Sequence, residues 1–197
     1  CGACGYAGCD DYAKAVAHSG AKTNLCIPGG AGTAAAVSAA MGVVAEEVKP
    51  QYAVVHCSGN CNATEDSMDY QGKQTCAASK MFYNGKGSCQ FGCLGFGDCM
   101  NVCQYGAIAI VNGIAVVDKS VCVGCGMCSK VCPNHLISVI PATNTIYVGC
   151  SSKDKGAVTR KVCKNGCICC KKCEKACEQG AITVTDNVAS IDPEKCI

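Results

Sequence analysis

Cys122-Val-Gly-Cys125-Gly-Met-Cys128-Ser-Lys-Val-Cys132-Pro133 is the most informative stretch of this chain. Three cysteines spaced two residues apart, then a fourth three residues later and a proline, form the run that binds a [4Fe-4S] cluster. The first three thiolates converge on one cluster, and the fourth is carried by a helical turn towards a second cluster. A zinc ribbon has separated C-x2-C pairs instead, and cysteines this close cannot all form disulfides. We therefore interpret the run as an iron–sulfur motif.

Cysteine is unusually frequent in the whole chain. The 197 residues include 23 cysteines, no tryptophan and three phenylalanines. A large apolar core is therefore not expected, and metal ligation is the natural source of stability. The number of cysteines is odd, and Cys169 and Cys170 are adjacent, which suits a disulfide framework poorly. So many free thiols indicate a reducing compartment. The net charge of +2 gives no reason to expect nucleic acid or an anionic membrane as a partner.

A first module is predicted at residues 1–48. Its candidate ligands are Cys1, Cys4, Cys9 and Cys26. The first three lie on a glycine-rich turn, and Asp10 and Asp11 are placed to cap a helix that ends near His18. Spacing alone leaves zinc as an alternative for such a set. Residues 23–45 carry no charge, but they are too rich in alanine and glycine to span a bilayer, and we expect an alanine-rich helix near 32–41.

Residues 49–88 are expected to form a linker and then a segment with three more cysteines. Those cysteines are Cys57, Cys61 and Cys76. The β-branched residues at 52–56 predict a short strand before them. We interpret the three cysteines as ligands of an additional cluster whose fourth ligand is not obvious, with spare buried thiols as the alternative.

Residues 89–149 follow the loop–helix–strand order, used twice, of a bacterial two-cluster ferredoxin. Two β-rich runs at 106–111 and 114–118 are joined by Asn112-Gly113, which predicts a hairpin. Residues 136–140 and 145–148 predict a second pair of short strands.

The cross-over rule for such ferredoxins assigns the ligands of both clusters. One cluster takes Cys103, Cys122, Cys125 and Cys128. The other takes Cys132 together with Cys93 and Cys99 of the first motif. That motif departs from the usual pattern, because Phe96 stands where its second cysteine is expected. We assign Cys89 to fill the gap.

An internal repeat extends the cysteine pattern to the end of the chain. The spacing of Cys76, Cys89, Cys93, Cys99 and Cys103 recurs in Cys150, Cys163, Cys167, Cys173 and Cys177, with Cys170 completing the second copy. Cys150 and Cys163 are therefore expected to complete or share the additional cluster, and Cys169 to be a bystander thiol. Cys196 resembles the start of another motif, so we expect a fragment that ends inside a truncated module at 150–197.

Basic residues are concentrated between residues 153 and 175. They are Lys153, Lys155, Arg160, Lys161, Lys164, Lys171, Lys172 and Lys175, against Asp154 and Glu174. A solvated helix face is one interpretation. A docking surface for an acidic carrier such as ferredoxin is the other.

The stretch CGACGYAGCDDYAKA at residues 1–15, with CIPGG at 26–30, resembles the four-cysteine domain of the B subunits of Rnf complexes, which are membrane-bound ferredoxin:NAD oxidoreductases. Ferredoxin-like repeats follow in the same order, so the resemblance covers most of the chain. It implies an α+β fold of small iron–sulfur modules and a [4Fe-4S] cluster on the first four cysteines. It also implies electron transfer from ferredoxin to membrane and NAD-reducing partner subunits, coupled to Na+ or H+ movement. An N-terminal membrane helix would precede residue 1 and hold the chain at the cytoplasmic face of the cell membrane.

The sequence contains no nucleotide-binding loop, no nucleophile–base pair and no pair of positioned carboxylates. We therefore expect no substrate chemistry on this chain, only electron transfer between clusters. Two alternatives remain at this stage: the cluster-carrying arm of a soluble hydrogenase or dehydrogenase, and a structural zinc protein.

Overall fold

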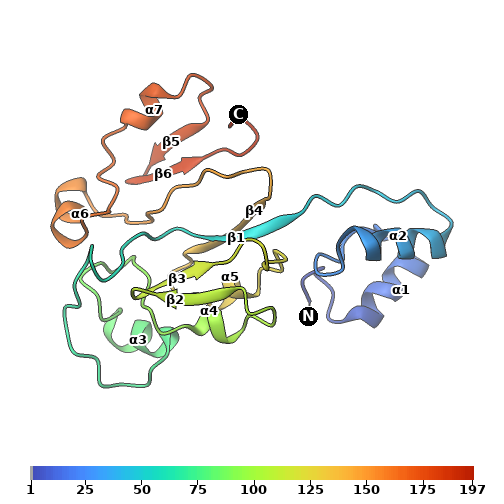
Figure 1. The fold of residues 1–197 in the computed structure, drawn as a ribbon, viewed down its shortest axis with the longest axis horizontal. Coiled ribbons are helices and arrows are strands. Elements are labelled where there is room, and N and C mark those ends of the chain that lie inside the picture. Colours follow the sequence, from blue (N-terminus) through green and yellow to red (C-terminus); the bar gives the residue numbers. More distant parts are fainter. Residues whose placement is uncertain (1) are drawn as a thin grey trace.

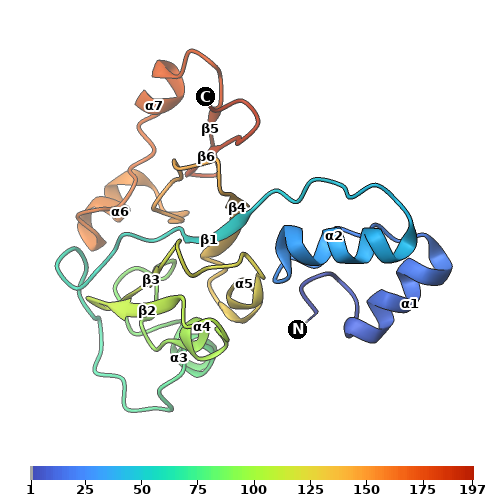
Figure 2. The same cartoon turned by 45° about the vertical axis from the view of Figure 1, so that its right-hand side comes forward.

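The computed structural model describes residues 2–197 as three parts that follow one another along the chain (Figures 1 and 2). A pair of helices comes first, a central body follows, and a smaller lobe ends the chain. The helices are α1 Cys9–Ser19, α2 Gly30–Met41, α3 Cys76–Tyr83, α4 Asp98–Asn101, α5 Met127–Val131, α6 Gly156–Val162 and α7 Lys172–Ala176. The strands are β1 Gln51–Val55, β2 Ile108–Val111, β3 Ile114–Val117, β4 Ile137–Pro141, β5 Ile182–Thr185 and β6 Val188–Ile191. The α+β class expected from the sequence is confirmed.

The helices α1 and α2 form the N-terminal part, and the alanine-rich helix is confirmed. The capping role predicted for Asp10 and Asp11 is wrong, because Gly8 is the N-cap residue and no side chain caps α1. Both aspartates lie inside the first turn, where their charge favours the helix dipole. A buried hydrogen bond of 2.6 Å between the hydroxyls of Thr23 and Ser38 holds the connecting loop against α2. No helix among residues 2–197 is long and apolar enough to cross a membrane.

Two antiparallel strand pairs form the central body. The predicted hairpin is confirmed as β2 and β3, and its turn residues Asn112 and Gly113 both have positive φ, 49° and 80°. The predicted strand at 52–56 is also confirmed as β1, but β1 pairs with β4, with Val55 opposite Ile137. A strand from the segment expected to be a linker therefore pairs with a strand of the ferredoxin-like module.

The strand predicted at residues 145–148 is wrong. β4 already has β1 as its partner, and residues 145–148 form irregular backbone instead. They pack beside β1 through His56, whose Nδ1 lies 2.7 Å from the Val148 carbonyl oxygen and whose ring meets Tyr147 edge-on.

A small apolar core lies between the strand pairs and the short helices. Leu136, only 1% exposed, packs there with Ile137, Val55 and Ile108, and the thiols of cysteines line its edge. Fully burying one such aliphatic side chain is worth about 1.5–3 kcal/mol. Because the core is so small, the cysteine-rich loops pack directly against the few buried aliphatic side chains that stabilise the fold.

The helix α3 was not predicted from the sequence. The Thr75 hydroxyl caps it by accepting a hydrogen bond from the Ala78 amide at 3.2 Å, and Asn84 ends it in the left-handed conformation. The N-terminus of α3 carries Cys76 to the edge of the central body.

Candidate iron–sulfur sites

The first candidate site contains the cysteines of the opening motif. Burial raises the pKa of the Cys128 thiol to about 11, and the neighbouring thiols of Cys122 and Cys125 add to the shift. The Ala53 amide of β1 lies 3.4 Å from the Cys122 sulfur and donates to it. Gly124 permits this approach, because a Cβ on it would lie 2.7 Å from the Gln51 oxygen.

Tyr105 has both Cys103 and Cys125 of the opening motif as neighbours. The pKa of the Tyr105 hydroxyl is raised, first by burial and then by three thiols around it, which are Cys125, Cys26 and Cys103. The phenol thus has thiols of the central body and of the N-terminal part as neighbours. Cys103 and Cys122 also pack against the small core that contains Cys128, so the four cysteines named by the cross-over rule lie in one region, and their ligation of one cluster stays a prediction.

The second candidate site differs from the sequence expectation. The pKa of the Cys99 thiol is raised to about 12, first by burial and then by three neighbouring thiols. These neighbours are Cys93, Cys76 and Cys132. The same four cysteines line one buried cavity beneath Leu136 and Ile137. Cys89, which we assigned to this group, lies elsewhere.

Cys76 lies beside the loop in which Phe96 stands at the position of the second cysteine. Its thiol accepts hydrogen bonds from the backbone amides of Asp98, Phe96 and Gly97, so its sulfur lies against the loop in which the second cysteine of the motif is missing. The Phe96 side chain itself packs on Tyr70 at 5.4 Å between ring centroids. The structure thus places a cysteine from α3, distant in sequence, beside the first motif, where Cys89 was expected.

The N-terminal group is described for three of its four cysteines, because Cys1 lies outside the described residues. Tyr12 connects the other members: its pKa is raised, first by burial and then by the neighbouring Cys26 and Cys4 thiols. Its hydroxyl donates to the Lys22 carbonyl at 2.8 Å and accepts from the Leu25 amide at 3.3 Å. These two bonds fix the loop that presents Cys26. Cys9 begins α1 and is exposed.

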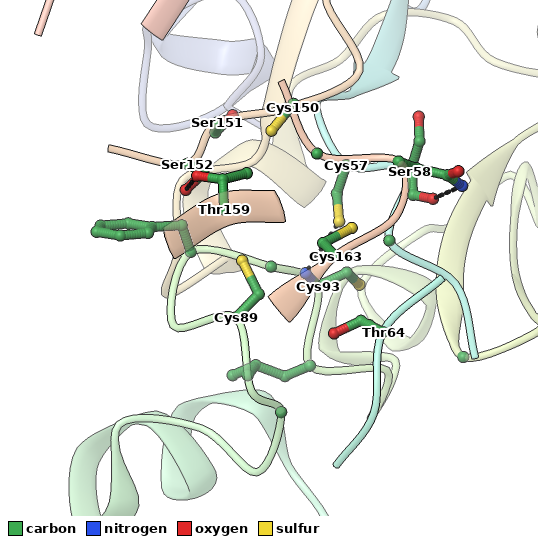
Figure 3. Close-up of a pocket in the computed structure, with 18 of the residues that line it drawn as sticks. Cys57, Ser58, Thr64, Cys89, Cys93, Cys150, Ser151, Ser152, Thr159 and Cys163 are labelled. Atoms are coloured by element: carbon green, nitrogen blue, oxygen red, sulfur yellow. Dashed lines mark hydrogen bonds between the residues drawn. The ribbon is translucent and has the colours of Figure 1, made fainter. Parts of the chain in front are cut away.

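A cavity of about 280 Å³ lies where the central body meets the C-terminal lobe (Figure 3). Cysteines from four separate segments line it: Cys57 and Cys61, Cys89 and Cys93, Cys150, and Cys163. Cys61 is exposed, whereas Cys163 is buried. The expectation that Cys57, Cys61 and Cys76 share a site therefore does not fit the arrangement, since Cys76 lines the neighbouring cavity.

The remaining cysteines lie in the C-terminal lobe. Cys170 and Cys173 are exposed, while Cys167, Cys177 and Cys196 are half-buried. The Ala181 amide donates to the Cys177 sulfur at 3.3 Å, and backbone hydrogen bonds such as this one lower the pKa of that thiol. Cys169 has a positive φ of 55° and donates its S–H to the Asn187 carbonyl, and its role as a bystander thiol stays a prediction.

The thiol environments fit iron–sulfur clusters chemically. Burial raises the pKa of the Cys99 and Cys128 thiols, so cluster binding to them must release protons. Amide donors already point at the sulfurs, for example Leu136 at Cys132 over 3.4 Å, and such bonds stabilise bound thiolates. No three His, Cys, Asp or Glu side chains of residues 2–197 converge as ligands of a single ion. A [4Fe-4S] cluster requires a wider arrangement, because each thiolate binds its own iron.

Comparison with known families supports the same chemistry. Residues 1–28 match a family model described as "Putative Fe-S cluster", and residues 115–138 match one described as "4Fe-4S binding domain". These matches confirm [4Fe-4S] clusters as the cofactor type. The first covers the N-terminal cysteines, and the second contains the opening motif.

The chain is also similar over its full length to three curated proteins. It is 40% identical to the B subunit of an ion-translocating oxidoreductase complex of Methanosarcina acetivorans, of which it covers 75%. It is 38% identical to the B subunit of the Na(+)-translocating ferredoxin:NAD(+) oxidoreductase complex of Acetobacterium woodii and covers 59% of it. It is 39% identical to the B subunit of the proton-translocating ferredoxin:NAD(+) oxidoreductase complex of Clostridium ljungdahlii and covers 70% of it.

Proposed function

Because this chain belongs to the family of B subunits of ion-translocating oxidoreductase complexes, the Rnf complexes, we propose that it carries electrons from reduced ferredoxin to the other subunits. The names of two relatives include ferredoxin, NAD+ and Na+ or protons. From this family membership we also propose that the partner subunits reduce NAD+ and move Na+ or H+. The chain would then lie on the cytoplasmic face of the membrane. It is the cluster-bearing subunit of an oxidoreductase rather than the site of substrate chemistry.

The observation that carries the proposal is that neighbouring cysteine groups adjoin one another. Cys4 of the N-terminal group and Cys122 of the opening motif line the same cleft, and Tyr105 has thiols of both groups, Cys26 and Cys125, as neighbours. The helices α4 and α5, which carry Cys99 and Cys128, are in direct contact in the central body. Electrons cross between clusters only over short separations, so a row of adjoining sites is what a carrier needs.

The chain contributes ligands, burial and hydrogen bonds, while bound [4Fe-4S] clusters supply one-electron redox chemistry. We assign four ligands to each of three sites. The N-terminal site takes Cys1, Cys4, Cys9 and Cys26. The site of the opening motif takes Cys103, Cys122, Cys125 and Cys128. The site beneath Leu136 takes Cys76, Cys93, Cys99 and Cys132.

The C-terminal lobe carries the start of a further module. Cys167, Cys170 and Cys173 occupy the positions of the first three ligands in the repeat, and we propose them as ligands of one more cluster. We assign no partners to Cys177 and Cys196. The exposed lysines Lys171, Lys172 and Lys175 surround this module and are the proposed contact for ferredoxin.

The proposal is tested by mixing the anaerobically reconstituted, oxidised chain with stoichiometric reduced ferredoxin and freezing the mixture for EPR spectroscopy. The signals of the reduced chain, recorded separately after reduction with dithionite, should appear while the signal of reduced ferredoxin falls, because each electron gained by the chain is lost by ferredoxin. Appearance of these signals with dithionite but not with ferredoxin would refute ferredoxin as the donor. Zinc in place of iron in the purified chain would refute the electron-carrier function altogether.

A further inference from the structure

The cavity between the central body and the C-terminal lobe is lined by thiols from segments far apart in the sequence. Figure 3 shows the side chains of Cys57, Cys89, Cys150 and Cys163 around it, on four different stretches of chain. Cys57 follows β1, Cys89 precedes the first ferredoxin motif, and Cys150 and Cys163 flank α6. The cavity is therefore formed only when the two repeats fold against each other.

The four thiols are mutual neighbours. The pKa of the Cys89 thiol is raised, first by burial and then by three other thiols, which are Cys57, Cys150 and Cys163. The pKa of the Cys57 thiol is likewise raised, first by burial, with Cys163 and Cys150 adding to the shift. Cys61 lines the same cavity but is exposed, and Cys76 lines the cavity beneath Leu136 instead.

The surrounding backbone is arranged to receive negative charge on these sulfurs. The Cys93 amide donates to the Cys57 sulfur at 3.3 Å, and the Gly59 amide also donates to it. The Phe91 amide donates to the Cys89 sulfur. Amide donors of this kind stabilise thiolates that are bound to iron.

Gly59 leaves the space that two of these thiols need. A Cβ at this position would lie 3.3 Å from the Cys163 sulfur and 3.6 Å from the Cys57 sulfur. The two sulfurs therefore face the same small residue from two segments far apart in the sequence. A larger side chain would crowd both of them.

We propose that Cys57, Cys89, Cys150 and Cys163 hold an additional [4Fe-4S] cluster in this cavity. The proposal rests on the electron-carrier function above and extends it. Cys89 thereby leaves the set that sequence spacing gave it, and Cys61 is not a ligand.

The position of this site gives it a role in the order of electron transfer. On one side Cys93, which supplies an amide to Cys57, has its own thiol in the site beneath Leu136. On the other side Cys150 neighbours Cys169, which lies between Cys167 and Cys170 of the C-terminal lobe. The additional cluster would therefore connect the central body to the C-terminal lobe, and its ligands would bind the two parts together.

The test uses serine variants of the full 197-residue chain, reconstituted anaerobically with iron and sulfide. Cys89→Ser, Cys150→Ser and Cys163→Ser should each lose the same signal from the EPR spectrum of the reduced chain, and iron and sulfide should fall by one cluster's content. Cys61→Ser, from the rim of the same cavity, is the matched control and should keep the full content. Cys132→Ser should lose a different signal.

Combining two of the changes protects the test against general unfolding. Cys150→Ser with Cys163→Ser should lose no more iron than either change alone, because both remove ligands of one cluster. Additive losses, or a Cys89→Ser spectrum that matches Cys132→Ser instead of Cys150→Ser, would overturn the proposal. So would equal iron loss from Cys61→Ser and Cys89→Ser. The iron count is independent of any reaction with ferredoxin, so failure of this site and failure of the electron-carrier function are separate results.

Discussion

The Asp98 carboxylate caps the helix that begins at Cys76. One of its oxygens accepts the Cys76 amide at 3.1 Å, and the other accepts the Ala77 amide at 3.0 Å. Asp98 itself begins α4, next to Cys99. A single side chain thus holds α3 against the loop of the ferredoxin motif, and with it the thiol that replaces the missing cysteine.

Asp98→Ala should therefore loosen one cluster without removing a ligand. Loss of two charge-assisted hydrogen bonds at a half-buried position costs about 1–2 kcal/mol, which corresponds to roughly 5- to 30-fold faster iron release from the site of Cys76. The measurement is the rate of iron transfer to a chelator, followed by the colour of the complex. Asp69→Ala, in an exposed loop before α3, is the control and should release iron at the parent rate. Equal rates for both variants would contradict the anchoring role.

Leu136→Ala should destabilise the central body more than any surface change. The side chain is 1% exposed, and its truncation leaves a cavity beside the Cys99 and Cys132 thiols. Such truncations cost about 2–5 kcal/mol, so the temperature at which cluster absorbance collapses should fall by roughly 5–15 °C. Val116→Ala on β3, where the side chain is 44% exposed, is the control and should change this temperature little. A similar fall for both variants would place the stabilising core elsewhere.

Local patterns in the sequence predicted the local elements well. Asn112-Gly113 between two β-rich runs predicted the hairpin, because that turn needs residues that accept positive φ. The β-branched run before Cys57 predicted β1. Neither pattern indicates which distant strand β1 pairs with, and the partner β4 lies more than 80 residues away. The wrong strand at 145–148 followed from pairing β4 with its neighbour in sequence.

The ligand groups were predictable only in part for the same reason. The gap at Phe96 showed that a ligand must come from outside the motif, but spacing favoured Cys89 because it lies closer in the sequence. Thr75 before Cys76 was an available helix-cap signal that could have indicated α3. The choice between Cys76 and Cys89 depends on the Asp98 contact, which joins residues 22 positions apart and leaves no local pattern.

Tyr12→Phe should loosen the loop that presents Cys26. The change removes the hydroxyl that donates to the Lys22 carbonyl and accepts from the Leu25 amide, at a cost of about 1–2 kcal/mol. The Leu25 amide should then exchange with deuterium roughly 5- to 30-fold faster, as measured by mass spectrometry of the peptide that contains it. Tyr83→Phe, on an exposed tyrosine of α3, should leave this exchange unchanged. Unchanged exchange in Tyr12→Phe would mean that the loop is held by other contacts.

Neutralising the lysines of the C-terminal lobe should slow the encounter with ferredoxin. Lys171, Lys172 and Lys175 are all exposed, and the acidic residue near them, Glu174, lies only 3.7 Å from the Lys171 nitrogen. Such a patch attracts an acidic carrier over about one Debye length, which is ~10 Å at 0.1 M salt. The lysines should therefore act mainly on the rate at which ferredoxin associates with the chain. Changing all three to glutamine should lower the second-order rate of electron uptake roughly 3- to 10-fold at low salt.

The same variant should also show a weaker dependence of that rate on ionic strength, because fewer charges remain to be screened. The control changes the exposed Lys14, Lys49 and Lys73 to glutamine, which removes the same net charge from other parts of the chain. If both triple variants slow the reaction equally, net charge alone steers ferredoxin. If neither variant does, the concentration of basic residues between 153 and 175 is simply a solvated face.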